Sequence, residues 1–177
     1  RGLGDVYKRQ QYGLFRIPLG VNAGAPQRLF ASSARDGQPM VSPDGAQLAF
    51  TSDRSGAFAL WWARLNEPAS LQMIEGMHPE ARQPMDWAAD GRQLLVTGRD
   101  ADGVPGIYEV APEEGHWVKL AVPVREPLQA VYGPAPNTLL VVERGDDERM
   151  ALTLFDRSQQ PWKRLASLDG VSQVRYD

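Results

Sequence analysis

Short apolar runs of four to six residues alternate along the whole chain with clusters of Gly, Pro, Asn and Asp. Runs of this length, rich in leucine, β-branched and aromatic residues and bounded by turn formers, are typical of β-strands. A helical pattern, with apolar residues three and four positions apart, is not found anywhere in the sequence. The pattern therefore predicts an all-β chain of many short strands.

The strand pattern also repeats. Leu48, Leu94 and Leu140 hold matching places in three similar segments, each 46 residues from the next. A second strand follows each segment, opened by an aliphatic residue, and a polar or basic pair marks a further strand at the end of each unit. A period in the forties with about four strands per unit is typical of a β-propeller blade.

The turn Ser42-Pro43-Asp44-Gly45 precedes the first of these segments, and its backbone geometry explains its composition. Proline fixes φ at the second turn position, and Gly accepts a positive φ. Gly45, Gly91 and Asn137 recur at intervals of 46 residues, and Asn is the commonest non-glycine residue in the left-handed region. Asp44 is therefore interpreted as a turn residue and not as a catalytic or metal-binding carboxylate.

The turn Ser42–Gly45, followed by the stretch Leu48–Gly56 and by Leu60-Trp61, resembles the repeat of TolB-like propellers, relatives of the WD40 class. The resemblance is specific over residues 38–74, fair over 83–121 and weak over 125–167. It implies sheets that pack face to face around an axis.

The expected architecture is an all-β, partial β-propeller arc of about three complete four-stranded blades, with partial blades at both ends. The complete blades are expected near 36–74, 80–121 and 125–167, and the partial blades at 12–30 and 171–176. Residues 1–10 resemble a translated cloning adapter, which suggests a fragment of a larger gene, and they are left out of the fold prediction. We expect apolar faces at the two ends of the arc to promote association.

Alternation along the central strand of each blade predicts which side chains are buried and in which direction they point. One set should face one neighbouring blade: Leu48, Phe50, Leu94, Val96, Leu140 and Val142. A second set should face the other neighbour: Ala49, Leu95 and Val141.

Composition and charge exclude several classes of function. The net charge is −3 and the basic residues are dispersed, so direct contact with nucleic acid is not expected. The longest apolar runs, such as Leu139–Val142, are too short to cross a bilayer. The absence of cysteine excludes disulfides and thiolate metal sites.

Catalytic motifs are also missing. The sequence has no Gly-x-Ser-x-Gly, His-Glu-x-x-His, Ser-x-x-Lys or P-loop pattern. His78 and His116, the only histidines, are expected in different solvated loops. The acidic stretches Asp100–Gly103 and Asp146–Glu148 are expected to be hairpin tips because the first lacks the remaining ligands of a calcium loop. We therefore expect no catalytic residue, no metal site and no cofactor.

Arginines recur where the loops of one propeller face should lie. Antiparallel strands alternate in direction, so the loop after the second strand and the loop between blades emerge on the same face. The candidate partner-binding residues there are Arg35, Arg54, Arg82, Arg99, Arg125 and Arg144. They could bind a protein or a small anionic ligand, or they could brace the loops through nearby acids, and the sequence favours bracing.

Three functions remain open. The first is a non-enzymatic interaction or sensor module of an exported protein. This function is suggested because the sequence of residues 31–40 resembles the C-terminal, periplasmic propeller of membrane-bound winged-helix transcriptional regulators. The second is the substrate-gating propeller of a prolyl-oligopeptidase-type serine peptidase. The third is a TolB translocation protein. The first is preferred, with a periplasmic or otherwise exported location.

Overall fold

The computed structural model describes residues 12–19, 24–81, 83–145 and 148–174. Several of the expected features lie outside this range: residues 1–10, Arg82, Asp146 and the last two residues of the strand expected at 171–176. Every regular element in the described part is a β-strand. No described helix is long and apolar enough to cross a membrane.

The strands form four antiparallel sheets, one of two strands and three larger ones. The N-terminal hairpin contains β1 (Leu14–Arg16) and β2 (Gln27–Leu29). Blade 1 contains β3 (Asp36–Val41), β4 (Gln47–Ser52), β5 (Ala59–Arg64) and β6 (Glu67–Met73). Blade 2 contains β7 (His78–Pro79), β8 (Asp86–Trp87), β9 (Leu94–Arg99), β10 (Pro105–Ala111) and β11 (His116–Lys119). Blade 3 contains β12 (Glu126–Tyr132), β13 (Thr138–Arg144), β14 (Met150–Asp156) and β15 (Lys163–Asp169).

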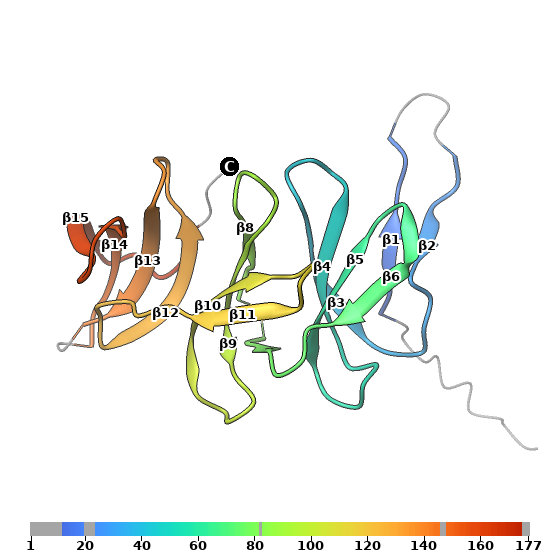
Figure 1. Cartoon of the computed structure of the whole chain (residues 1–177), viewed down its shortest axis with the longest axis horizontal. Coiled ribbons are helices and arrows are strands. Elements are labelled where there is room, and N and C mark those ends of the chain that lie inside the picture. Colours follow the sequence, from blue (N-terminus) through green and yellow to red (C-terminus); the bar gives the residue numbers. More distant parts are fainter. Residues whose placement is uncertain (1–11, 20–23, 82, 146–147, 175–177) are drawn as a thin grey trace, which may run out of the picture.

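Within each blade, strands that follow one another in sequence are neighbours in the sheet, except that β7 and β8 of blade 2 both pair with β9. The sheets stand in a row, from the N-terminal hairpin at the right of Figure 1 to blade 3 at the left. The described strands form no closed ring, and the predicted all-β partial propeller is confirmed.

The first strand of every blade is irregular, and each irregularity contains a proline. In blade 1 the register with β4 shifts between Gly37 and Met40, around Pro39. In blade 2 this strand is split into β7 and β8, which both pair with β9, and Pro84 lies in the gap. In blade 3 the shift begins at Pro127. Proline cannot donate a ladder hydrogen bond, so it interrupts the pairing at these points.

Apolar clusters fill the spaces between successive sheets. Leu48 and Phe50 pack against Leu14 of the hairpin. Ala49 points the other way, into the cluster that blade 1 shares with blade 2. Leu95 likewise points from blade 2 toward blade 3. The predicted alternation is confirmed for blades 1 and 2. Because side chains point to both faces of each central strand, they pack each sheet against both of its neighbours.

In blade 3 the predicted direction is wrong. Leu139 and Val141 face blade 2, so Leu140 and Val142 point away from it. Val142 is nevertheless buried, whereas Leu140 is only partly buried.

The cause lies in the turn before β13. The N–H groups of Ser42, Ala88 and Gly133 donate to the carbonyls of Gln47, Gln93 and Thr138, respectively, so these pairs are equivalent. Gly45 and Gly91 stand two residues before the accepting residue, with φ of 71° and 68°. Asn137 has φ of 59° but stands one residue before Thr138. Its predicted left-handed conformation is confirmed, yet the alignment across this turn is displaced by one residue.

Candidate functional site

The connections at one edge of the arc form the candidate site, which we call the loop edge. It contains the segments between β2 and β3, β4 and β5, β6 and β7, β9 and β10, β11 and β12, and β13 and β14. The described parts of these connections lie along the lower side of the arc in Figure 1, and the turns β3–β4, β8–β9 and β12–β13 lie along the upper side. The direction of the antiparallel strands produces this separation.

Five of the six predicted arginines are described, and all five belong to the loop edge. Arg35 and Arg125 directly precede β3 and β12, Arg54 follows β4, and Arg99 and Arg144 end β9 and β13. Arg82 lies outside the described residues.

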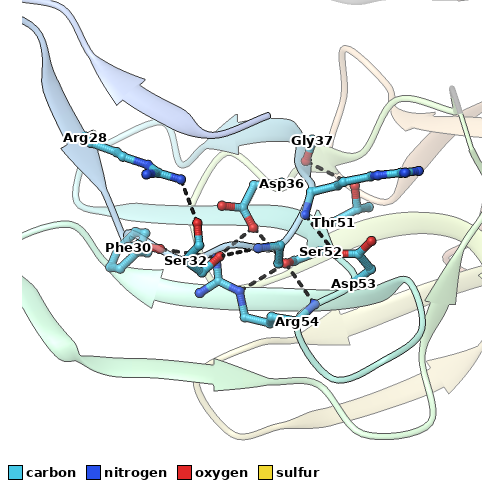
Figure 2. A network of polar contacts seen from close by, with 11 residues as sticks. Arg28, Phe30, Ser32, Asp36, Gly37, Thr51, Ser52, Asp53 and Arg54 are labelled. Atoms are coloured by element: carbon cyan, nitrogen blue, oxygen red, sulfur yellow. Dashed lines mark hydrogen bonds and ion pairs between the residues drawn. The ribbon is translucent and has the colours of Figure 1, made fainter. Parts of the chain in front are cut away.

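Arg54 is largely buried between the hairpin and blade 1. Its Nη2 lies 2.7 Å from Oδ1 of Asp36, and its Nε donates to the hydroxyl of Ser52. Its guanidinium also lies 5.1 Å from the ring centroids of Phe50 and Trp61. Figure 2 shows this network, with the side chains converging from β3 and from the end of β4. Arg54 is therefore held in the packing between sheets, in contrast to the surface role expected for it.

Arg99 is exposed and Arg144 is partly exposed, and both form pairs with nearby acids. Arg99 Nε lies 3.0 Å from a carboxylate oxygen of Glu80. Arg144 lies 3.7 Å from Glu126 and 3.4 Å from Glu148. Nε of Arg144 is buried and has no hydrogen-bond partner among the described residues. The loop-bracing contacts expected from the sequence are thus present, but they are exposed or long.

Three cavities follow one another along the loop edge. One of about 260 Å³ lies between blades 1 and 2 and includes Phe58 in its lining. A second of about 400 Å³ lies between blades 2 and 3, with Arg99 and Arg125 in its lining. A third of about 380 Å³ lies on blade 3, and its lining includes Arg125, Arg144, Arg149 and Arg164. Arg125 thus lines two adjoining cavities.

A polar cluster adjoins the third cavity, and in it Glu143 and Thr153 are buried and Arg164 is exposed. Thr153 donates a 2.5 Å hydrogen bond to Glu143, and Arg164 lies 3.1 Å from the same carboxylate. Sequence analysis did not single out this cluster. The alternation of residues along the strand could have identified it. Glu143 lies two residues after Val141 and four after Leu139, so it points to the same side of the strand, toward blade 2. A charged side chain buried at such a position requires a partner.

A second polar cluster joins blades 2 and 3 away from the arginine-lined cavities. Arg157 lies 2.7 Å from Glu109, which also accepts the hydroxyl hydrogen bond of Tyr132. The backbone N–H of Tyr132 donates to Asp86 over 2.7 Å. Burial raises the pKa of Asp86, and the hydrogen bond from Tyr132 opposes part of this effect. Burial and the nearby Glu109 carboxylate also raise the pKa of Tyr132.

Other candidate groups have structural explanations. His78 and His116 are both exposed but lie at the starts of β7 and β11, in contrast to the predicted loops. Nδ1 of His78 lies 3.1 Å from the carbonyl oxygen of Phe58. Asp100 accepts the backbone N–H groups of Asp102 and Val104, as expected for a hairpin tip. Among the described residues no group of three or more histidine or acidic side chains could hold a metal ion.

Comparisons of sequence find no matching family profile and no matching curated protein. Comparisons of structure find several solved proteins. TolB from Acinetobacter baumannii has a TM-score of 0.59 and 17% identity over 82% of this chain, which corresponds to 35% of TolB. A puromycin-hydrolyzing peptidase from Mycobacterium tuberculosis has a TM-score of 0.59 and 18% identity, covering 87% of this chain and 24% of the peptidase.

Oligogalacturonate lyase from Vibrio parahaemolyticus is similar to the same degree, with a TM-score of 0.59 and 10% identity over 88% of this chain and 47% of the lyase. The chain therefore spans less than half of each of these three proteins. Identities this low establish the fold alone. The described chain has the fold of a TolB-like β-propeller, in the form of an incomplete arc of blades.

Proposed function

We propose that the chain is a non-catalytic interaction module whose loop edge binds an acidic polypeptide. The observation that carries this proposal is the pair of adjoining cavities between blades 2 and 3 and on blade 3, whose linings contain Arg99, Arg125 and Arg144. Two adjoining cavities suit an extended ligand better than a single small molecule. Guanidinium groups bind carboxylates through paired hydrogen bonds, which gives such a surface its chemical preference.

The existing ion pairs do not prevent this binding. Arg99 and Glu80 are 52% and 43% exposed at their side chains, so their contact is worth about 1 kcal/mol or less. A carboxylate of the partner can replace Glu80 or Glu126 at small cost. Arg54 takes no part in the proposed site because its guanidinium is occupied by Asp36.

The wider function is proposed on the fold and the sequence together. The structural neighbours include a peptidase and a lyase as well as TolB, but this sequence has no Gly-x-Ser-x-Gly or comparable catalytic motif. A non-catalytic role is supported by that difference. The resemblance of residues 31–40 to a regulator propeller supports a sensory role in an exported protein, and cell fractionation of the complete gene product tests this location.

The binding role is tested with the 177-residue chain and a fluorescent polyglutamate peptide. We expect the double variant Arg99→Glu and Arg144→Glu to weaken binding by about tenfold or more, since attraction between opposite charges is replaced by repulsion at two positions. Arg92→Glu is the matched control because Arg92 is exposed and follows Gly91 in the β8–β9 turn at the opposite edge. Equal affinities of the double variant and the control would contradict the proposal.

A further inference from the structure

The cavity of about 380 Å³ on blade 3, which we call the blade 3 cavity, lies on the side of this blade that faces blade 2. Val141 faces blade 2, so Glu143 and its cross-strand partner Ala151, which both line the cavity, point to the same side. Pro123 and Val124, in the connection that leads from blade 2 to blade 3, complete the lining on the other side. Both blades that bound this cavity are described, so its walls are those of two assembled sheets.

In the other two blades an aromatic ring occupies the equivalent position. Three equivalent residues of the central strands each stand three places after the residue that accepts the turn hydrogen bond: Phe50, Val96 and Val141. Their cross-strand partners on the next strand are, in the same order, Trp61, Tyr108 and Thr153. Tyr108 is fully buried and packs edge to face against Trp117. Threonine has a much smaller volume than either ring, so blade 3 has a cavity where a closely packed sheet interface would be filled.

The side chains that replace the ring hold Arg164 in a fixed position at the cavity. The Arg164 guanidinium lies 5.5 Å from the ring centroid of Phe155 and 3.1 Å from a carboxylate oxygen of Glu143. Thr153 donates a hydrogen bond to the same carboxylate. The side chain of Glu143 is only 9% exposed, whereas that of Arg164 is 50% exposed. A buried carboxylate therefore orients an arginine whose other N–H groups are available to a ligand, and this preorganisation lowers the entropy cost of binding.

Basic side chains outnumber acids in the lining of the blade 3 cavity. The lining contains four arginines: Arg125, Arg144, Arg149 and Arg164. It also contains the carboxylates of Glu143 and Asp169, so it has an excess of two positive charges. Glu126 and Glu148, which pair with Arg144 from outside the lining, lie 3.7 and 3.4 Å from it. The buried Nε of Arg144 has no hydrogen-bond partner among the described residues. The cavity thus suits a compact anion with more than one negative charge.

We propose that the blade 3 cavity binds a phosphate group. A phosphate monoester has a charge of about −1.5 to −2 at neutral pH and three strong acceptor oxygens, whereas a carboxylate has one charge and two oxygens. Arg144, at the end of β13, and Arg164, on β15, can therefore bind one phosphate together through paired hydrogen bonds. This inference deepens the function proposed above and rests on it for the source of the phosphate, which is a phosphorylated side chain of the acidic partner.

Three fluorescent peptides test the inference with the 177-residue chain. Each is a polyglutamate peptide with a different central residue, which is phosphoserine, glutamate or serine. We expect the phosphoserine peptide to bind about tenfold more tightly than the glutamate peptide, because its central group adds both charge and acceptor oxygens. Inorganic phosphate is titrated separately by calorimetry, which distinguishes free phosphate from a phosphorylated side chain.

Two variants locate the phosphate, and cooperative urea unfolding shows that each is folded. Arg164→Lys retains the positive charge beside Glu143 but loses the planar fork, so the preference for phosphoserine should fall about fivefold or more. Thr153→Tyr introduces the residue that fills the equivalent position in blade 2, and it should remove the preference without a change of charge. Arg92→Lys, at the opposite edge, is the matched control and should change the preference by less than about twofold.

The results separate this inference from the function on which it rests. Equal affinities for the phosphoserine and glutamate peptides would overturn the phosphate site and leave acidic-peptide binding at the loop edge standing. An unchanged preference in both Arg164→Lys and Thr153→Tyr would also overturn the site. Binding of inorganic phosphate and of the phosphoserine peptide with equal affinity, with no binding of the other two peptides, would support the phosphate site but contradict the proposed function. Failure of all four probes to bind would overturn both.

Discussion

Arg54 and Asp36 form an ion pair in which the two side chains are only 11% and 1% exposed. The pair joins the start of β3 to the connection after β4, under the aromatic rings of Phe50 and Trp61. Removal of one partner leaves the other as an uncompensated buried charge, so we expect Arg54→Ala to lower the free energy of unfolding by about 3 to 5 kcal/mol. Urea denaturation monitored by tryptophan fluorescence measures the change.

Arg35→Ala is the control for this prediction. Arg35 is exposed, and the contacts shown for it are hydrogen bonds between its backbone and Asp53, which the substitution retains. Loss of the Arg35 side chain should change the free energy of unfolding by about 0.5 kcal/mol or less. Similar losses in the two variants would mean that Arg54 is not a structural residue.

The inner turns offer a second prediction. Gly45 has φ of 71°, and a Cβ added there would meet no atom within 4 Å, so any cost of Gly45→Ala comes from the backbone conformation. We expect a loss of about 1 to 2 kcal/mol in the free energy of unfolding. Gly24→Ala is the control, since Gly24 also has open space but no positive φ, and thermal denaturation should show little change.

The fold was predictable because two simple signals agree. The spacing of Gly45 and Gly91 sets the turns, and the alternation of Leu48, Ala49 and Phe50 sets the two buried faces of a strand. Both signals depend on local backbone geometry. The register of blade 3 was mispredicted because Asn137 and the two glycines share a conformation but not a position in the turn. A shift of one residue reverses the direction of every side chain in a strand.

The loop edge was predicted only in part. Strand direction placed the arginines on one edge, but sequence could not separate Arg54, which is buried, from Arg99, which is exposed. That difference depends on aromatic residues such as Trp61, which lies on the following strand and reaches the guanidinium only in the folded sheet. The cluster of Glu143, Thr153 and Arg164 likewise requires three strands to be assembled before it exists.

The register of blade 3 can be tested by two adjacent substitutions. Leu139 is fully buried in the cluster between blades 2 and 3, whereas Leu140 is partly buried on the other face. Leu139→Ala should therefore lower the free energy of unfolding by about 2 to 5 kcal/mol. Leu140→Ala should lower it by about 1 kcal/mol, as less apolar surface is lost. Urea denaturation that showed the larger loss for Leu140→Ala would instead support the alignment expected from the sequence.

The last prediction concerns Asp86, whose pKa is raised above its ordinary value of 3.8 by burial between blades 2 and 3. Because the folded state binds this proton more tightly than the unfolded state, the contribution of Asp86 to stability grows as pH falls through the raised pKa toward 3.8. Asp86→Asn retains an oxygen that accepts the Tyr132 N–H bond but removes the titration.

The free energy of unfolding of the unmodified chain, relative to Asp86→Asn, should therefore rise between neutral pH and about pH 4. Asp156→Asn provides a comparison of opposite sign, because hydrogen bonds from Ser158 lower the pKa of Asp156 and its stabilisation is lost as pH falls. Urea denaturation of the three proteins at several pH values measures both differences. A pH-independent difference for Asp86→Asn would show that the carboxylate is well solvated, and that the contact between Asp86 and Tyr132 does not hold blades 2 and 3 together in solution.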